Sequence, residues 1–217
     1  MSWEFPPATL FRTISRCRRL ATAPRIDGRL DEWSNECALP PVHELAGGAD
    51  YARLLMGWRE DGLYLAAEIP KTKPVVVNRS NPAAADALEI FIDTRAAQTG
   101  HRATQFCYHF RALPAGGGPE RTRAIIQQTP IRRALRRSPV APESAMRISS
   151  AQGVESYAVE LALSGDALHG LELRAGTRIA VAIIVHDLEH GRQYWGVARD
   201  FPYERDPSTW GLVELDG

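Results

Sequence analysis

The sequence DALEIFID, residues 86–93, decides the fold class because it alternates aliphatic residues with acidic and aromatic ones. In an extended strand successive side chains point to opposite faces, so every second residue shares a face. One face carries Leu88, Ile90 and Ile92. The other carries Glu89, Phe91 and Asp93. This pattern predicts a strand with one face in the core, and it leaves open whether the acids catalyse, bind a metal, line a ligand site or face water.

Two of these acids are too far apart to form a catalytic pair. Glu89 and Asp93 are separated by two strand repeats, roughly 13 Å at the usual rise per residue. Glycoside hydrolysis uses carboxyl groups about 5 to 9.5 Å apart. The chain also has no nucleophile signature and no phosphate-binding glycine loop, so we expect a protein that is not an enzyme.

Similar alternating segments recur along most of the chain, separated by turn residues, and helical periodicity is nearly absent. They occupy residues 51–58, 63–69, 87–93, 104–110, 122–127, 145–150, 155–163, 178–187, 192–197 and 210–215. Gly62 is expected to give the first hairpin its positive φ. One short helix is expected at 164–170. The sequence therefore predicts an all-β fold, a two-sheet antiparallel β-sandwich, with residues 25–217 as a single domain after an N-terminal extension, 1–24.

The composition excludes several partners. The chain has 217 residues with 26 basic and 26 acidic side chains, so no net charge favours nucleic acid or an anionic membrane. No segment is apolar for the roughly 18 residues that a membrane span needs. The N-terminus lacks a signal-peptide pattern, and we expect a cytoplasmic protein. The sequence does not indicate an oligomeric state.

Two local motifs invite functional interpretations. The sequence HDLEH at 186–190 has the spacing of one class of zinc peptidases, but that class needs a helix, and here a run rich in Ile and Val precedes the motif. We interpret it as a chance match on a strand connection.

The turn at 129–144 carries Arg132, Arg133, Arg136 and Arg137 between prolines. It could bind an anionic ligand, although a solvated arginine-rich turn is the simpler interpretation.

Four motifs in order resemble the family 9 carbohydrate-binding modules, which share a wider DOMON-like sandwich. They are RIDGRLDEW at 25–33, GWREDGLYLAAEI at 57–69, DALEIFID at 86–93 and RDPSTWGLVEL at 205–215. The resemblance implies a non-catalytic sandwich that binds a sugar, often with structural calcium, and holds the sugar between two tryptophans. The partner would then be a carbohydrate or another small polar ligand.

The residues of the family's site are only partly present. After Asn81 and Pro82 the expected stacking tryptophan is Ala83, and the second expected tryptophan is Glu204. The arginine expected on the strand after DALEIFID is Cys107, whereas Glu89 matches the glutamate that accepts hydrogen bonds from sugar hydroxyls. The predicted ligand-binding residues are Glu89, Asn81, His109, Trp195 and Tyr203.

Other interpretations remain open at this point. Related sandwiches hold haem through an axial Met, so Met56 with His109 or His186 is an alternative, although Met56 is more simply a core residue. A scaffold domain without a small ligand is a third possibility. No cofactor is expected, and the resemblance makes a structural calcium ion possible; acids available for it are Asp27, Asp31, Asp50, Asp86, Asp187 and Asp206. Trp58 and Trp210 are expected in the core.

Overall fold

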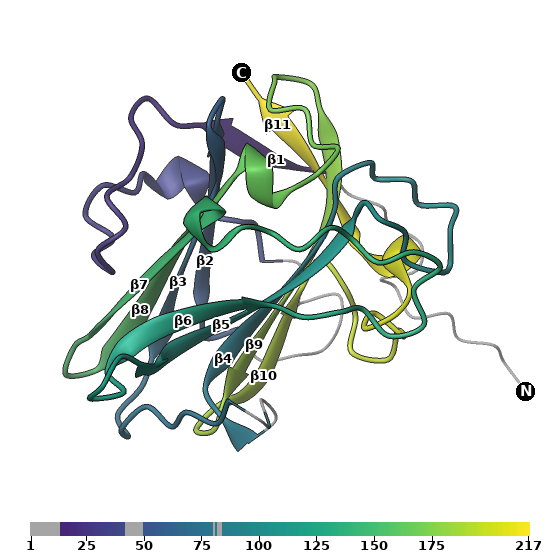
Figure 1. The fold of residues 1–217 in the computed structure, drawn as a ribbon. Helices are drawn as coiled ribbons and strands as arrows, with labels where there is room; N and C mark the ends of the chain where they lie inside the picture. Colours follow the sequence, from purple (N-terminus) through teal and green to yellow (C-terminus); the bar gives the residue numbers. More distant parts are fainter. Residues whose placement is uncertain (1–13, 42–49, 80, 82–83) are drawn as a thin grey trace, which may run out of the picture.

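The computed structural model describes residues 14–41, 50–79, 81 and 84–217, and almost all of its regular structure is β-strand (Figure 1). The strands are β1 (Ile14–Arg19), β2 (Arg53–Arg59), β3 (Gly62–Pro70), β4 (Ala87–Asp93), β5 (Cys107–Gly117), β6 (Arg123–Gln128), β7 (Met146–Gln152), β8 (Ser156–Ser164), β9 (Arg178–Asp187), β10 (Gly191–Trp195) and β11 (Gly211–Asp216). Short 3-10 turns are η2 (Asn35–Cys37), η5 (Glu143–Ala145), η6 (Gly165–Ala167) and η7 (Pro207–Thr209). The helix expected at 164–170 is thus reduced to the single turn η6.

The strands form one continuous sheet that folds over itself into two facing layers. The order is β6-β5-β4-β9-β11-β1-β2-β3-β8-β7, and β10 pairs with β9. One layer contains β6, β5, β4, β9 and β10; the other contains β2, β3, β8 and β7 (Figure 1). The predicted all-β sandwich is confirmed. The pairings are antiparallel except at β1, which runs parallel to both β11 and β2 and joins the layers.

The strand β1 lies in a segment that the sequence analysis assigned to an N-terminal extension. Its residues pair with β11 along Ile14 to Arg18 and with β2 at Arg18 and Arg19. Only Ser15 and Cys17 are buried, and three arginines point outward. The segment therefore has too few apolar residues to show a strand pattern, although its backbone completes the sheet.

The core between the layers follows the alternation that the sequence shows. Leu88, Ile90 and Ile92 of β4 lie in this core, as predicted, opposite aliphatic residues of β3 and β8. Trp58 is also there, and Trp210 is buried in a second cluster outside the β4 layer, so both tryptophans are core residues. Burial of these apolar side chains is the main favourable contribution to the stability of the folded state.

The hairpin of β2 and β3 is confirmed, but the reason for Gly62 differs from the expected one. Gly62 is not among the described glycines with positive φ. A Cβ atom there would instead clash with the carbonyl oxygen of Leu163 on β8, which pairs beside β3. Gly62 is therefore required for close strand approach.

The outer face of β2, β3 and β8 is covered by the segment RIDGRLDEW. Trp33 is buried there and its Nε1 donates a hydrogen bond of 2.9 Å to Glu160, which is fully buried on β8. The backbone N–H groups of Asp27 and Gly28 each donate to the other Glu160 oxygen at 3.1 Å. Because these bonds satisfy a buried carboxylate, this motif has a structural role.

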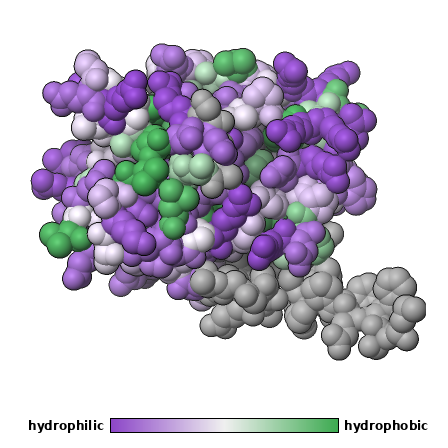
Figure 2. All heavy atoms as spheres, turned by 90° about the horizontal axis from the view of Figure 1, so that it is seen from below, coloured by the Kyte–Doolittle hydropathy of each residue, from purple (hydrophilic) through white to green (hydrophobic). Residues whose placement is uncertain are grey.

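The surface seen in Figure 2 is mostly hydrophilic, and hydrophobic residues form only small patches on it. Among the described residues, no helix has the length and apolar character needed to cross a bilayer.

Candidate ligand-binding site

The outer face of the β4 layer places Glu89 at the centre of a row of side chains. Strand register aligns Glu89 with Arg111 on β5 and with Ile184 on β9. Ile184 is in turn aligned with Tyr194 on the edge strand β10. In the neighbouring rows, Phe91 pairs with His109, and His186 pairs with Arg192. Glu89 is therefore surrounded by polar and aromatic residues from three other strands.

Glu89 is only 7% exposed, and its carboxylate is held by basic groups. Arg111 donates from Nη2 to Oε1 at 3.2 Å, and His186 Nε2 lies 3.2 Å from Oε2. His109 Nε2 is 3.5 Å from Oε1 without forming a hydrogen bond. Burial alone would raise the pKa of Glu89, but the imidazoles of His109 and His186 outweigh it and hold the pKa below its usual range. Glu89 is therefore an anion at neutral pH.

Two buried side-chain nitrogen atoms around Glu89 lack a hydrogen-bond partner among the described residues. They are His109 Nε2 and Arg111 Nε. Buried polar atoms in native proteins are nearly always satisfied by protein, water or ligand, so each exception calls for an explanation. Both atoms belong to side chains beside one carboxylate, which marks this cluster as a place where an external molecule can supply acceptors.

The aromatic rings near Glu89 pack against one another instead of presenting a flat platform. His109 stacks on Phe91 with ring centroids 4.1 Å apart and an interplanar angle of 8°. Tyr203 meets Phe91 edge-on at 5.8 Å, and Trp210 tilts against Phe91 at 5.4 Å. Phe91, Tyr203 and Trp210 are all buried, and only Tyr194 is partly exposed. Among these rings, only Tyr194 therefore offers a surface on which a ligand could stack.

The edge strand β10 contributes an exposed cation, Arg192. Its pKa is raised, mainly by a hydrogen bond with Tyr194 and further by the nearby Tyr203 and Glu89. The pKa of Tyr203 is also raised, chiefly by burial and then by Tyr194 and Glu89, so this phenol stays neutral and able to donate. Arg192 thus borders the Glu89 cluster from the solvent side.

The structure brings together three of the five predicted ligand-binding residues, namely Glu89, His109 and Tyr203. It does not bring Trp195 to this face, because Trp195 pairs with Ile183 and points into the core between the layers. Asn81 is exposed on the segment before β4, where its N–H donates to Asn78 Oδ1 at 2.9 Å. Pro82 and Ala83, where the family's first platform was expected, lie outside the described residues.

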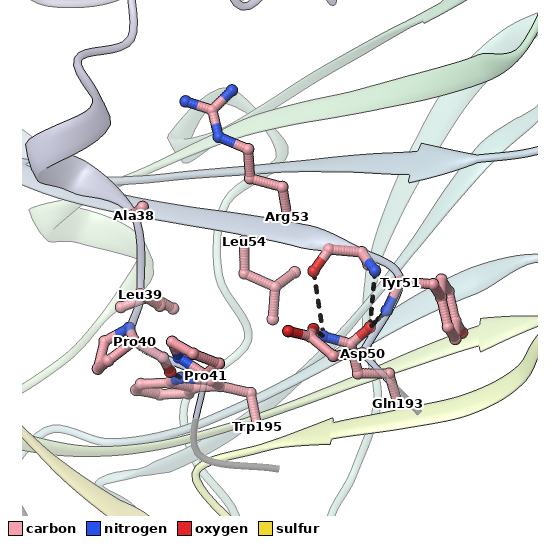
Figure 3. A pocket seen from close by; sticks show the side chains of 11 residues that line it. Ala38, Leu39, Pro40, Pro41, Asp50, Tyr51, Arg53, Leu54, Gln193 and Trp195 are labelled. Carbon is pink, nitrogen blue, oxygen red and sulfur yellow. Dashed lines mark hydrogen bonds between the residues drawn. The ribbon is translucent and has the colours of Figure 1, made fainter. Parts of the chain in front are cut away.

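Trp195 instead lines a separate pocket of about 240 Å³ between β10 and β2 (Figure 3). Its Nε1 donates to the carbonyl of Pro40 at 3.0 Å. Gln193 closes the same side: its Oε1 accepts from the backbone N–H groups of Tyr51 and Ala52, and its Nε2 donates to Ala52 O and to Asp50 Oδ1. All four hydrogen bonds of the Gln193 amide are therefore made within the chain, and this pocket offers less to a polar ligand than the Glu89 cluster does.

The other two acids of DALEIFID have structural partners. Asp93 accepts hydrogen bonds from the N–H groups of Arg95 and Ala97 and closes the turn after β4. Asp86 is fully buried and accepts from Lys71 Nζ at 3.2 Å, and the same ammonium donates to Asp187 at 2.9 Å. Two of the acids considered for calcium therefore already hold a cation supplied by the chain.

The HDLEH motif lies on the hairpin of β9 and β10 instead of a helix. His186 points to Glu89, whereas His190 contacts Asp187 at 3.0 Å. Within the described part of the chain, no group of three or more His, Cys, Asp or Glu side chains is arranged to hold a metal ion. Zinc peptidase geometry is thus not assembled at this motif.

The haem alternative fails on geometry. Met56 is fully buried in the core between the layers. His109 and His186 lie on the outer face of the other layer, beside Glu89. A sheet separates the sulfur from both imidazoles, so they cannot ligate one iron.

The sequence analysis missed Arg111, His186 and Arg192 as members of the site. The sequence analysis expected the family's arginine at Cys107. Arg111 lies beside Glu89 instead, four residues after Cys107 and on the same face of β5. A search of every second residue along β5 would have found it. The contributions of His186 and Arg192 depend on the register of β9 and β10 against β4, which no local pattern shows.

This fold and this site define a β-sandwich ligand-binding domain whose candidate site is a buried carboxylate on the outer face of one layer. The chain belongs to the carbohydrate family 9 binding domain-like family, whose model matches residues 26–217. The family is one of non-catalytic carbohydrate-binding domains, in agreement with the expectation that the protein is not an enzyme. No curated protein matches the chain.

Solved structures with the same fold include sugar complexes. A family 9 carbohydrate-binding module from Caldicellulosiruptor kristjanssonii in complex with cellotriose has a TM-score of 0.61 and 17% identity, covering 94% of both chains. A family 9 module from that organism in complex with glucose has a TM-score of 0.61 and 16% identity, covering 94% of this chain and 96% of the other. A candidate carbohydrate-binding protein from Bacteroides uniformis has a TM-score of 0.62 and 15% identity, covering 94% and 98%. At these identities the likeness concerns the fold.

Proposed function

We propose that the protein is a non-catalytic carbohydrate-binding module whose ligand binds on the outer face of β4, β5, β9 and β10 around Glu89. The observation that carries the proposal is a buried, ionised carboxylate flanked by two buried nitrogen atoms that have no hydrogen-bond partner among the described residues. A carboxylate accepts hydrogen bonds from sugar hydroxyls, and each hydroxyl can also accept from a neighbouring N–H group. Family membership supports the same ligand class.

The mode of binding would differ from stacking between two tryptophans. The rings around Phe91 are packed together, and of these only Tyr194 is partly exposed. Hydrogen bonds to Glu89, Arg111 and His109 would therefore supply most of the orientation and specificity, with Tyr194 as the remaining apolar contact. Because these polar groups come from rigid strands, the site is preorganised.

The test is binding of free mono- and disaccharides, measured by calorimetry, to the wild type and to Glu89→Gln. The substitution keeps the shape of the side chain but removes the charge and one acceptor, so we expect binding to be lost or to weaken by about tenfold or more. The variant Glu143→Gln is a matched control, because Glu143 is exposed in η5 and belongs to another part of the surface. Folding of each variant is checked by circular dichroism.

Two results would contradict the proposal. One is a folded wild-type protein that binds none of the neutral or acidic sugars in a broad glycan panel. The other is sugar binding that Glu89→Gln leaves unchanged, which would move the site elsewhere on the molecule.

A further inference from the structure

The outer face of the β4 layer carries more positively charged side chains than binding of a neutral sugar requires. Arg111 already compensates the charge of Glu89 through the 3.2 Å contact between Arg111 Nη2 and Glu89 Oε1. Arg192 is a second guanidinium at the same cluster, and it forms no ion pair with any described residue. Glu204 also acts on Tyr203, but it is exposed to solvent, where charge is screened. Arg192 thus lies near the Glu89 carboxylate without a direct ion pair to it, and its exposed guanidinium can pair with an anion from outside the chain.

More positive charge lies on the same face. Ile131 is buried in the cluster that contains Phe91 and Tyr203, and Ala134 packs against that cluster. The turn that carries these residues is therefore anchored on the outer side of β4. Its arginines are exposed and form no ion pairs with described residues: Arg132, Arg133, Arg136 and Arg137. In a chain with balanced charges, this turn adds exposed guanidinium groups to the outer side of the β4 layer.

Because the site lacks a pair of stacking tryptophans, these positive charges matter for its affinity for a sugar. A sugar held without a pair of stacking tryptophans must gain most of its binding energy from hydrogen bonds, and those to charged groups are about twice as strong as neutral ones. Guanidinium groups match carboxylates in planar geometry and can donate two parallel hydrogen bonds. A carboxylate on the ligand would pair with Arg192, while ring hydroxyls of the ligand would meet Glu89 and the buried donors Arg111 Nε and His109 Nε2.

From this geometry we propose that the site selects a sugar bearing a carboxylate, a uronic acid residue, with Arg192 as the residue that recognises its charge. The inference rests on the proposed function and specifies its ligand class. Arg192 is the selective element because it is exposed and lacks an ion-pair partner, whereas Arg111 is already committed to Glu89.

The experiment compares three ligands that differ at one carbon: D-glucuronic acid, D-glucuronamide and D-glucose. Calorimetry is done at constant ionic strength with the wild type, Arg192→Gln and Arg199→Gln. Arg199 is a suitable control because it is an exposed arginine on the segment that follows β10. We expect glucuronic acid to bind the wild type about tenfold more tightly than glucose, and glucuronamide to bind like glucose. Arg192→Gln should remove this preference and Arg199→Gln should retain it.

Each other outcome overturns the inference. If glucose binds as tightly as glucuronic acid, the charge selection is wrong while the proposed carbohydrate-binding function stands. If the preference for the acid survives Arg192→Gln, or falls equally in Arg199→Gln, it reflects general attraction to a basic surface. If the folded protein binds none of the three ligands, the inference fails, and the wider glycan panel decides the proposed function separately.

Discussion

Asp86 lies just before β4 and Glu89 lies three residues later within it, and both are buried acids with opposite surroundings. Asp86 is satisfied entirely within the chain: Lys71 donates to Oδ1 at 3.2 Å, and the N–H groups of Leu188 and Val76 donate at 2.9 and 2.7 Å. Glu89 is paired as well, but two buried nitrogen atoms beside it, His109 Nε2 and Arg111 Nε, have no hydrogen-bond partner among the described residues. A closed network stabilises the fold, whereas an open one leaves polar groups for a ligand.

The difference arises from where the sheet places each acid. Asp86 lies before β4 at the end of the sandwich, where Lys71 follows β3 and Asp187 ends β9. Three chain segments converge there, and one buried ammonium joins two of them. Glu89 lies in mid-strand on an outer face, with the edge strand β10 only two strands away. An acidic residue therefore stabilises the fold at position 86, whereas at position 89 it is a candidate ligand-binding group.

The largest expected effect is from Lys71→Met, which leaves two buried carboxylates without their cation. Breaking a buried ion pair by removing one partner costs about 3–5 kcal/mol. For a chain of this length that corresponds to a fall in melting temperature of about 2–4 °C per kcal/mol. Chemical and thermal unfolding measure both quantities.

Lys73→Met is the matched control, because Lys73 is an exposed lysine two residues further along the chain. It should change the free energy of unfolding by less than about 0.5 kcal/mol. Equal effects of the two substitutions would show that the Lys71 network does not stabilise the fold.

The substitution Glu89→Gln should sharpen the comparison by separating binding from stability. It weakens the contacts with Arg111 and His186 and removes the counter-ion of Arg111. Because the Arg111 side chain is 17% exposed, water can solvate part of its remaining charge. We expect a loss of about 1–3 kcal/mol of stability, less than for Lys71→Met, together with the loss of sugar binding. A larger destabilisation than in Lys71→Met would make Glu89 the more structural of the two acids.

The sequence predicted the sandwich and the two faces of β4 because a period of two is a local signal. It assigned Leu88 to the core and Glu89 to the opposite face, and the structure confirms both. It could not assign roles to the acids, because their contacts depend on the pairing of distant strands. Strand pairing brings Asp86 and Asp187 to the same Lys71. It also brings Glu89 to Arg111 and His186. Register between distant strands is fixed by the whole core and not by any one segment.

A smaller effect is expected on acidification. Burial would raise the pKa of Asp187, but its hydrogen bonds with Lys71 and with the N–H groups of His190 and Glu189 hold it below the usual 3.8. The pKa of Glu89 is lowered as well. For acids with lowered pKa, the stabilisation is fully present above the unfolded-state value and is lost as the pH falls through the folded-state value. Stability should therefore fall between pH 5 and pH 3, as measured by urea unfolding.

The same measurement on Lys71→Met tests the cause. Without the ammonium, the pKa of Asp187 should move back toward its unfolded value, so the loss of stability between pH 5 and pH 3 should be smaller than in the wild type. An equal loss in both proteins would assign the acid sensitivity to other groups.

The smallest effect is expected from calcium, which the family resemblance made possible. The donor set does not fit an ion at the best-formed acid pair, because Asp86 and Asp187 enclose Lys71 and their remaining oxygens accept backbone N–H groups. A calcium ion needs six to eight oxygen ligands and could enter only by displacing that ammonium. Millimolar calcium or EDTA should therefore leave the melting temperature of the wild type unchanged, because an ion that does not bind the native state cannot stabilise it. A rise of several degrees in the wild type would instead show that other oxygens of the chain hold a structural ion.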